Sequence, residues 1–120
     1  MSRILLVDDS ITSRKVLRRI LEEAGHEVVG EATDGQAGVD LYSSLKPDIV
    51  TLDITMPVLD GIEALRQIKE TDENAKVVMV TSAGQKSKMV EAVRYGAVEF
   101  VMKPFQSEQL LSIIEKVVEL

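Results

Sequence analysis

The sequence has no cysteine, no tryptophan, a single histidine and only 3% aromatic residues. The lack of cysteine excludes disulfides, thiolate metal sites and thiol nucleophiles, and one histidine excludes a metal site built from several. Long apolar runs are also missing, because none approaches the ~20 residues that a membrane-spanning helix needs. The apolar run at the N-terminus stops at Asp8, too early for a secretory signal peptide. We therefore expect a cytoplasmic protein.

Positive charge is scarce as well. The chain carries 14 Lys and Arg residues against 20 Asp and Glu residues, a net charge of −6. This acidic balance argues against nucleic acid as the main partner. Hydrophobic residues make up 45% and charged residues 28% of the chain, which is typical of a globular protein. Since 120 residues suit one domain of ordinary size, we predict a single domain over residues 1–120.

Short apolar segments alternate five times with longer segments of helical period. The predicted strands are Ile4–Val7, Val28–Ala32, Ile49–Leu52, Val77–Val80 and Phe100–Met102. The predicted helices have inward faces that include Leu17 and Ile20, Ala37 and Leu41, Ile62 and Leu65, Met89 and Val93, and Leu110 and Ile114. The first strand is apolar throughout, as a central parallel strand must be. Five such units with right-handed crossovers predict an α/β fold, a single (βα)5 domain with a doubly wound parallel five-stranded sheet.

Polar residues directly follow four of the predicted strands. Asp8 and Asp9 follow the first strand, Asp53 the third, Thr81 the fourth and Lys103 the fifth. Because the carboxyl ends of parallel strands meet at one edge of a sheet, we expect these side chains to lie close together. Three carboxylates at ~5 Å would repel by about 3 kcal/mol per pair at an effective dielectric near 20, which favours a bound cation. All-oxygen ligands suit Mg²⁺.

Beside a cation, one carboxylate can attack phosphorus and form an aspartyl phosphate. Asp53 is the best candidate because it stands alone at its strand end, whereas the adjacent Asp8 and Asp9 suit metal binding. Lys103 can pair with phosphate, and the Thr81 hydroxyl can donate a hydrogen bond to it. The sequence therefore predicts a Mg²⁺-dependent phosphoryl-transfer site with Asp53, Thr81 and Lys103 as its reactive residues.

The ordered set of motifs resembles the receiver domains of bacterial response regulators along the whole chain. The motifs are Leu6-Val7-Asp8-Asp9, Asp53-Ile54-Thr55-Met56-Pro57, Asp60-Gly61, Thr81 and Lys103-Pro104-Phe105. The nearest likeness within the family is to the stand-alone chemotaxis regulators of the CheY type. The resemblance implies a flavodoxin-like sheet with strand order 2-1-3-4-5, which is the known order of CheY and does not follow from connectivity alone.

The resemblance also assigns roles to the site residues. It implies that Asp53 is the phosphoacceptor, and that Asp8, Asp9, Asp53 and the backbone carbonyl of Thr55 hold Mg²⁺. Thr81 is expected to turn toward the phosphoryl group when Asp53 is modified. Each of these roles belongs to the family and is carried here onto the matching position.

Two further features follow from the resemblance. Phe100 occupies the position of the family's switch aromatic, which is often a tyrosine, so here a change in burial is possible but a hydrogen-bonded switch is not. The Lys103–Pro104 peptide bond is expected to be cis, a state that only an X-Pro bond adopts cheaply.

The implied function is that of a two-component response regulator. A sensor histidine kinase, here a chemotaxis kinase, would phosphorylate Asp53 and so change binding to a flagellar motor switch protein or a phosphatase. The contact surface would be the fourth helix, fifth strand and fifth helix of a monomer. We expect a switch that assists only its own phosphorylation and dephosphorylation, not an enzyme. The basic residues of the first helix form either a solvated face or a docking surface for an acidic partner; they are Arg14, Lys15, Arg18 and Arg19.

Other functions stay open at this point. The same site residues would serve a phosphorelay intermediate that passes its phosphoryl group to a histidine phosphotransfer protein, or a receiver domain cut from a longer regulator. A Mg²⁺-dependent phosphatase that forms an aspartyl phosphate is disfavoured, because such enzymes carry Asp-x-Asp after the first strand and need a cap for which 120 residues leave no room. A flavin-binding protein is disfavoured by the scarcity of aromatic residues.

Overall fold

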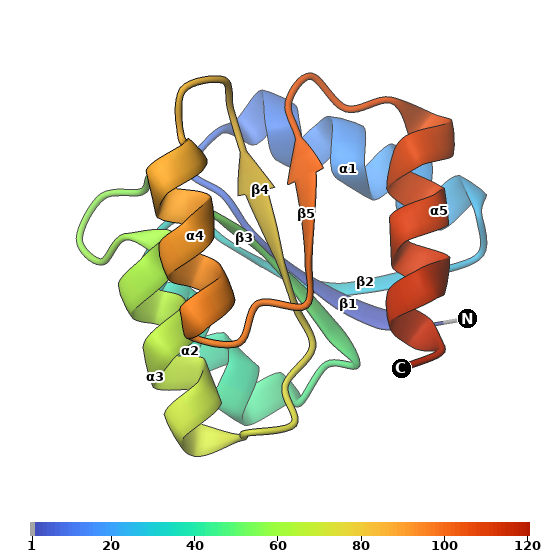
Figure 1. Cartoon of the computed structure of the whole chain (residues 1–120). Coiled ribbons are helices and arrows are strands. Elements are labelled where there is room, and N and C mark those ends of the chain that lie inside the picture. The colour runs from blue at the N-terminus through green and yellow to red at the C-terminus, as the bar shows by residue number, and fades with distance from the viewer. Residues whose placement is uncertain (1) are drawn as a thin grey trace.

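The computed structural model describes residues 2–120, and across these residues five strands alternate with five helices. The strands are β1 (Arg3–Val7), β2 (Glu27–Ala32), β3 (Ile49–Asp53), β4 (Val77–Thr81) and β5 (Glu99–Met102). The helices are α1 (Ile11–Glu23), α2 (Gly35–Leu45), α3 (Gly61–Thr71), α4 (Lys86–Arg94) and α5 (Ser107–Val118). The strands pair in parallel in the order β2-β1-β3-β4-β5, which confirms the predicted fold (Figure 1). None of the described helices has the length and apolar character required to cross a membrane.

Helices cover both faces of the sheet, with α1 and α5 on one face and α2, α3 and α4 on the other (Figure 1). The strand β1 contributes side chains to the hydrophobic cores on both faces of the sheet. Its successive side chains point to opposite faces, so Leu5 and Val7 join one core while Ile4 and Leu6 join the other. All four are fully buried, and each contributes roughly 1.5–3 kcal/mol of hydrophobic stabilisation. This double burial explains the unbroken apolar run in the sequence.

The face that α2 presents to the sheet is wider than the predicted one. Ala37 and Leu41 pack against the core and are partly buried, and Gly38 and Tyr42 are buried beside them. A Cβ on Gly38 would lie 2.7 Å from the side chain of Val7. The missing side chain lets α2 approach β1 closely, and Tyr42, about one turn further along the helix, is buried on the same side.

The packing of α4 also differs from the prediction. Ala92 is buried and Met89 is partly buried, but Val93 is 57% exposed, so its predicted inward position is wrong. Because α4 touches the core along a narrow stripe, a third apolar residue one position further round faces solvent. Val90 is likewise 53% exposed. The helix therefore leaves apolar surface uncovered.

Three helices begin at a side chain that caps the backbone. Ser10, Asp34 and Asp60 each accept a hydrogen bond from the backbone N–H three residues further on, at the starts of α1, α2 and α3. In the described chain, α4 and α5 begin at Gln85 and Gln106 without a side-chain cap. A cap typically contributes about 1 kcal/mol, so the start of α4 depends on other contacts.

Candidate functional site

The predicted site residues meet at the carboxyl edge of the sheet. Asp8, Asp9 and Asp53 each offer one oxygen, and these three oxygens lie within 4.8 Å of one another. Asp8 and Asp53 are 1% and 7% exposed, while Asp9 is exposed. The Nζ atom of Lys103 lies 3.1 Å from a carboxylate oxygen of Asp8 and 3.1 Å from one of Asp53. The ends of β1 and β3 and the residue after β5 thus form one acidic pocket with a single ammonium group.

The loop after β3 returns to the strand end and fixes the position of Asp53. The N–H of Gly61 donates a hydrogen bond to the Ile54 carbonyl at 2.8 Å, and a Cβ on Gly61 would lie 2.0 Å from the Asp53 carbonyl oxygen. Only glycine fits at this distance, so the start of α3 lies directly against the backbone of Asp53. In the same loop Val58 has a φ of 68°, a left-handed conformation that β-branched residues rarely adopt.

Burial and like charge act together on the carboxyl groups. Burial raises the pKa of Asp53, the charge of Asp8 raises it further, and the ammonium of Lys103 offsets part of the effect. For Lys103 itself, burial would lower the pKa, but hydrogen bonding and charge from Asp8 and Asp53 outweigh burial and raise it. Since one ammonium cannot neutralise three carboxylates, the pocket holds excess negative charge.

The oxygen donors of the pocket fit a divalent cation such as Mg²⁺. One oxygen of Asp8, Oδ1, accepts a hydrogen bond from the Ser10 N–H at 2.8 Å. The other, Oδ2, is buried, and its polar partner among the described residues is the Lys103 ammonium at 3.1 Å, which Asp53 shares. A buried carboxylate oxygen whose counter-charge is shared with a second carboxylate is incompletely compensated, and a hard cation with oxygen ligands would satisfy it.

Thr81 and Phe100 lie on the neighbouring strands β4 and β5. Thr81 is 1% exposed, and its hydroxyl donates a hydrogen bond to Gln85 Oε1 at 3.1 Å rather than to Asp53. Phe100 is partly buried against the core that underlies α2, α3 and α4. The Lys103–Pro104 peptide bond, which follows β5, is cis.

The reasoning from sequence missed the contacts that two residues, Arg14 and Gln85, make near the pocket. The guanidinium of Arg14 donates a hydrogen bond to the Asp8 carbonyl oxygen at 2.7 Å and pairs with Glu31 at 2.9 Å. Arg18 also pairs with Glu31, so two of the four basic residues of α1 are engaged within the chain. The side chain of Gln85 connects the ends of two loops. No motif marks either residue, because both contacts depend on the loop conformation.

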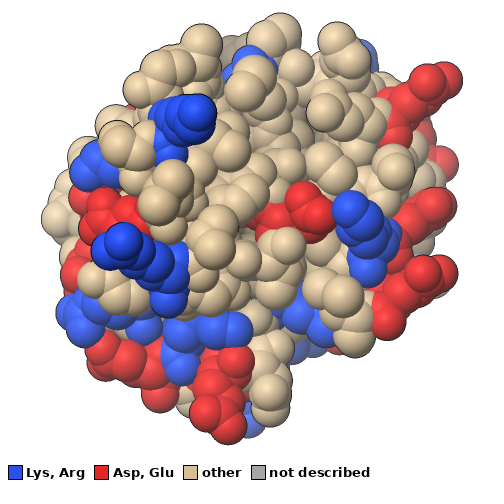
Figure 2. Space-filling view, viewed as in Figure 1, with Lys and Arg blue, Asp and Glu red and all other residues tan. Residues whose placement is uncertain are grey.

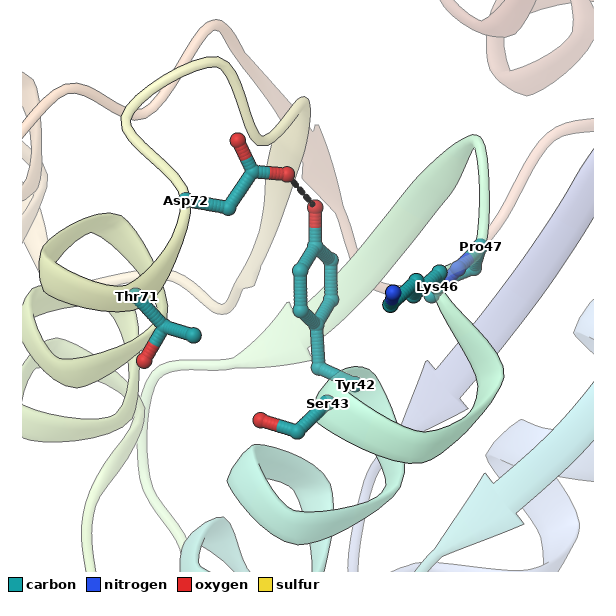
Figure 3. Close-up of a pocket in the computed structure, with 6 residues that line it drawn as sticks. All are labelled: Tyr42, Ser43, Lys46, Pro47, Thr71 and Asp72. Carbon is teal, nitrogen blue, oxygen red and sulfur yellow. Dashed lines mark hydrogen bonds between the residues drawn. The ribbon is translucent and has the colours of Figure 1, made fainter.

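A separate hollow of about 340 Å³ lies between the C-terminal ends of α2 and α3. Figure 3 shows the residues that line it, which are Tyr42, Ser43, Lys46, Pro47, Thr71 and Asp72. The Tyr42 hydroxyl donates to Asp72 at 3.0 Å, and Asp72 also accepts from the backbone N–H of Asn74 at 3.0 Å. These polar groups satisfy one another, and Pro47 leads into the end of β3 opposite to Asp53. We therefore assign this hollow a structural role.

Comparisons with known proteins agree with this geometry. Residues 4–115 match the family model described as the response regulator receiver domain. The chain is 45% identical over 115 residues to the chemotaxis protein CheY of Thermotoga maritima, with 96% of each chain covered. It is 46% identical over 116 residues to the chemotaxis protein CheY of Listeria monocytogenes, covering 97% of this chain and 98% of that one. The fold matches a chain of the solved CheX–CheY–beryllofluoride–Mg²⁺ complex from Borrelia burgdorferi with a TM-score of 0.92 and 37% identity, covering 96% of this chain and 87% of that one.

The fold and the acidic pocket define a phosphoryl-accepting class of domain, and the chain belongs to the response regulator receiver domain family. Its function is that of a response regulator in two-component signal transduction, as predicted. CheY-like members of this family act as switch proteins that interact with histidine kinases and with other partners such as CheX. The family generally uses Mg²⁺ at an acidic site of the kind formed by Asp8, Asp9 and Asp53. The roles of individual residues stay predictions.

Proposed function

We propose that this protein is a cytoplasmic chemotaxis regulator of the CheY type, one receiver domain over residues 1–120, in which Asp53 accepts a phosphoryl group from a sensor histidine kinase. The observation that carries the proposal is the convergence of the buried Asp8 and Asp53 with the exposed Asp9 and with Lys103 in one acidic pocket. Identity of 45% and 46% over nearly the whole length of two CheY proteins supports the chemotaxis assignment.

In the proposed reaction, an oxygen of Asp53 forms a bond to phosphorus while the bond between phosphorus and the donor histidine nitrogen breaks. The electron pair of the broken bond stays on that nitrogen, and one proton completes the neutral imidazole. Phosphoryl transfer depends mainly on positioning and on neutralising charge. The contact between Gly61 and the Asp53 backbone holds the nucleophile in a fixed direction at the end of β3.

The remaining pocket residues balance the charge of the phosphoryl group. Asp8, Asp9, Asp53 and the Thr55 carbonyl would hold Mg²⁺, which supplies positive charge beside the phosphoryl oxygens when bound. The ammonium of Lys103, already 3.1 Å from Asp53, pairs with one of those oxygens. The Thr81 hydroxyl donates a hydrogen bond to another oxygen after it turns away from its present acceptor.

The output surface is the face formed by α4, β5 and α5. Figure 2 shows basic side chains, with acidic ones among them, on the side of α4 and acidic side chains along the outer side of α5, while the mostly uncharged surface between them carries an acidic and a basic group side by side. Exposed apolar residues on these elements include Val90, Val93, Tyr95 and Met102. Apolar anchors flanked by charge of both signs suit a partner protein such as a flagellar motor switch protein or a phosphatase. Phe100 lies on β5 beneath this face, where a change in its burial would link the pocket to the surface.

Amide NMR spectra of the labelled protein test this proposal. Mg²⁺ is added first, then beryllofluoride as a phosphoryl mimic, then a peptide from a flagellar motor switch protein. We expect shifts at Asp53, Thr81 and Phe100, followed by tighter peptide binding to the loaded protein, while Asp53→Asn shows neither effect. A wild-type protein that ignores beryllofluoride would refute the receiver site. A loaded protein whose affinity for the peptide is unchanged would contradict the motor output and favour a phosphorelay role.

A further inference from the structure

The side chain of Gln85 bridges two loops at the edge of the acidic pocket. Its Oε1 atom accepts a hydrogen bond from the Ser82 N–H at 2.7 Å and another from the Thr81 hydroxyl at 3.1 Å. Its Nε2 atom donates to the Thr55 hydroxyl at 2.8 Å. Gln85 therefore joins the end of β4 to the loop after β3, and it lies immediately before the first residue of α4.

The bond to Thr81 competes with the proposed reaction. A threonine hydroxyl has a single proton, so it donates to one acceptor at a time. Thr81 is 1% exposed, which leaves water little access to the hydroxyl. The hydroxyl has two acceptors in reach, Gln85 Oε1 at 3.1 Å and the Ser82 carbonyl oxygen at 3.3 Å. While the proton points to Gln85 Oε1, the shorter of the two contacts, it is not available to a group on Asp53.

We propose that Gln85 is a positioning residue that holds the Thr81 hydroxyl away from Asp53 and so favours the unphosphorylated state. This inference rests on the proposed function. A phosphoryl group on Asp53 shifts the equilibrium by offering Thr81 a better acceptor, and the bond to Gln85 is the shorter of the two contacts that it must replace. A typical hydrogen bond makes a small net contribution, so the restraint amounts to about two- to tenfold in the equilibrium between the two states.

The same bond ties the state of the pocket to α4. In the described chain this helix has no side-chain cap. Gln85 is the residue that directly precedes it. The side chain that would normally cap the helix points back to Ser82, Thr81 and Thr55. Release of Thr81 therefore frees one of the contacts that fix the start of α4, on the face proposed to bind partners.

The chain provides a matched control in Gln106. It is also a glutamine at the residue before a helix, also has no side-chain cap, and is exposed at the start of α5. A general effect of removing a glutamine from a helix start would appear equally at both positions.

The test is a beryllofluoride titration of the full chain at saturating Mg²⁺, followed by NMR. Gln85→Met keeps the length of the side chain without its polar atoms, and Gln85→Ala provides a second variant in case the first packs poorly. Both are expected to bind beryllofluoride about two- to tenfold more tightly than the wild type, while Gln106→Ala binds it with unchanged affinity. The same substitutions are then made in a Thr81→Val background, where the gain is expected to disappear because the competing hydroxyl is gone.

The outcomes separate this inference from the proposed function. If the wild type binds beryllofluoride and neither Gln85 variant binds it more tightly, the proposed role of Gln85 is overturned and the receiver site stays intact. A gain that persists in the Thr81→Val background would show that Gln85 does not act through Thr81, which also overturns the inference. A wild-type protein that fails to bind beryllofluoride would overturn the proposed function and the inference with it.

Discussion

Asp53 meets two conflicting requirements within one side chain. A nucleophilic carboxylate must be ionised, yet Asp53 is 7% exposed and shares its surroundings with the buried Asp8. Both conditions raise the pKa of its carboxyl group, and Lys103 offsets them only in part. The pocket therefore stores unfavourable charge repulsion in the folded protein, which a bound cation would relieve.

The raised pKa of Asp53 has a consequence for stability without metal. The folded protein holds the proton more tightly than the unfolded chain, so folding is favoured at low pH and loses stability as the pH rises through the folded-state pKa. Above that pH the ionised group opposes folding. We expect Asp53→Asn in EDTA to increase the free energy of unfolding at neutral pH, on the order of 1 kcal/mol.

Urea unfolding between pH 4 and neutral pH measures this effect. Asp40→Asn is the matched control, since Asp40 is an exposed carboxylate on α2. The gain from Asp53→Asn should grow as the pH rises and shrink when Mg²⁺ is added, because the wild type alone gains the full benefit of the cation. If Asp53→Asn were no more stable than the wild type at neutral pH in EDTA, the claim that charge repulsion in the pocket opposes folding would be contradicted.

Val58 has a backbone conformation that a β-branched residue rarely adopts. It is 83% exposed and has a φ of 68°, so the left-handed backbone costs about 1–2 kcal/mol that its side chain does not recover by packing. Asparagine tolerates this conformation. Val58→Asn should therefore raise the free energy of unfolding by about 1 kcal/mol. Val90→Asn, at an exposed helical position, should leave it nearly unchanged, and equal effects at the two positions would disprove the strain argument.

At the scale of the elements, the strands were predictable, whereas the inward faces of α2 and α4 were predicted only in part. A strand buried on both faces is apolar throughout, as in Ile4–Val7, so its place and its polar end can be recognised in the sequence. A helix has only one apolar stripe, and in α2 the buried stripe also includes Gly38 and Tyr42, because Gly38 lets the helix lie close to β1. In α4 the contact with the core is so narrow that Val93 faces solvent.

The start of α3 is the element on which the position of Asp53 depends most directly. In Gly61→Ala the new methyl group would lie 2.0 Å from the Asp53 carbonyl oxygen, so either α3 or the end of β3 must move. We expect the free energy of unfolding to fall by about 2 kcal/mol and the affinity for beryllofluoride to drop with it. Urea unfolding measures the free energy of unfolding, and an NMR titration measures the affinity for beryllofluoride.

Gly25→Ala separates the steric effect from the general cost of replacing a glycine. Gly25 has a φ of +90°, but a Cβ there would have open space around it. This variant should lose about 1 kcal/mol of stability and keep its affinity for beryllofluoride. If Gly61→Ala bound beryllofluoride as well as Gly25→Ala does, the start of α3 would not position Asp53.

On the scale of the whole molecule, the site joins residues from the two ends and the middle of the chain. Asp8, Asp53, Thr81 and Lys103 are brought together because every strand of a parallel sheet ends at the same edge. That rule made the pocket predictable from the sequence. The hydrogen bonds of Gln85 were not, since they depend on how the loops after β3 and β4 fold against each other.

The central claim is that Asp53 is the group that accepts the phosphoryl group, and intact-mass spectrometry tests it most directly. The wild type and Asp53→Asn are incubated side by side with Mg²⁺ and a small-molecule phosphodonor such as acetyl phosphate. We expect one added phosphoryl group on the wild type and none on Asp53→Asn. Modification of the variant at the same rate as the wild type would contradict the claim.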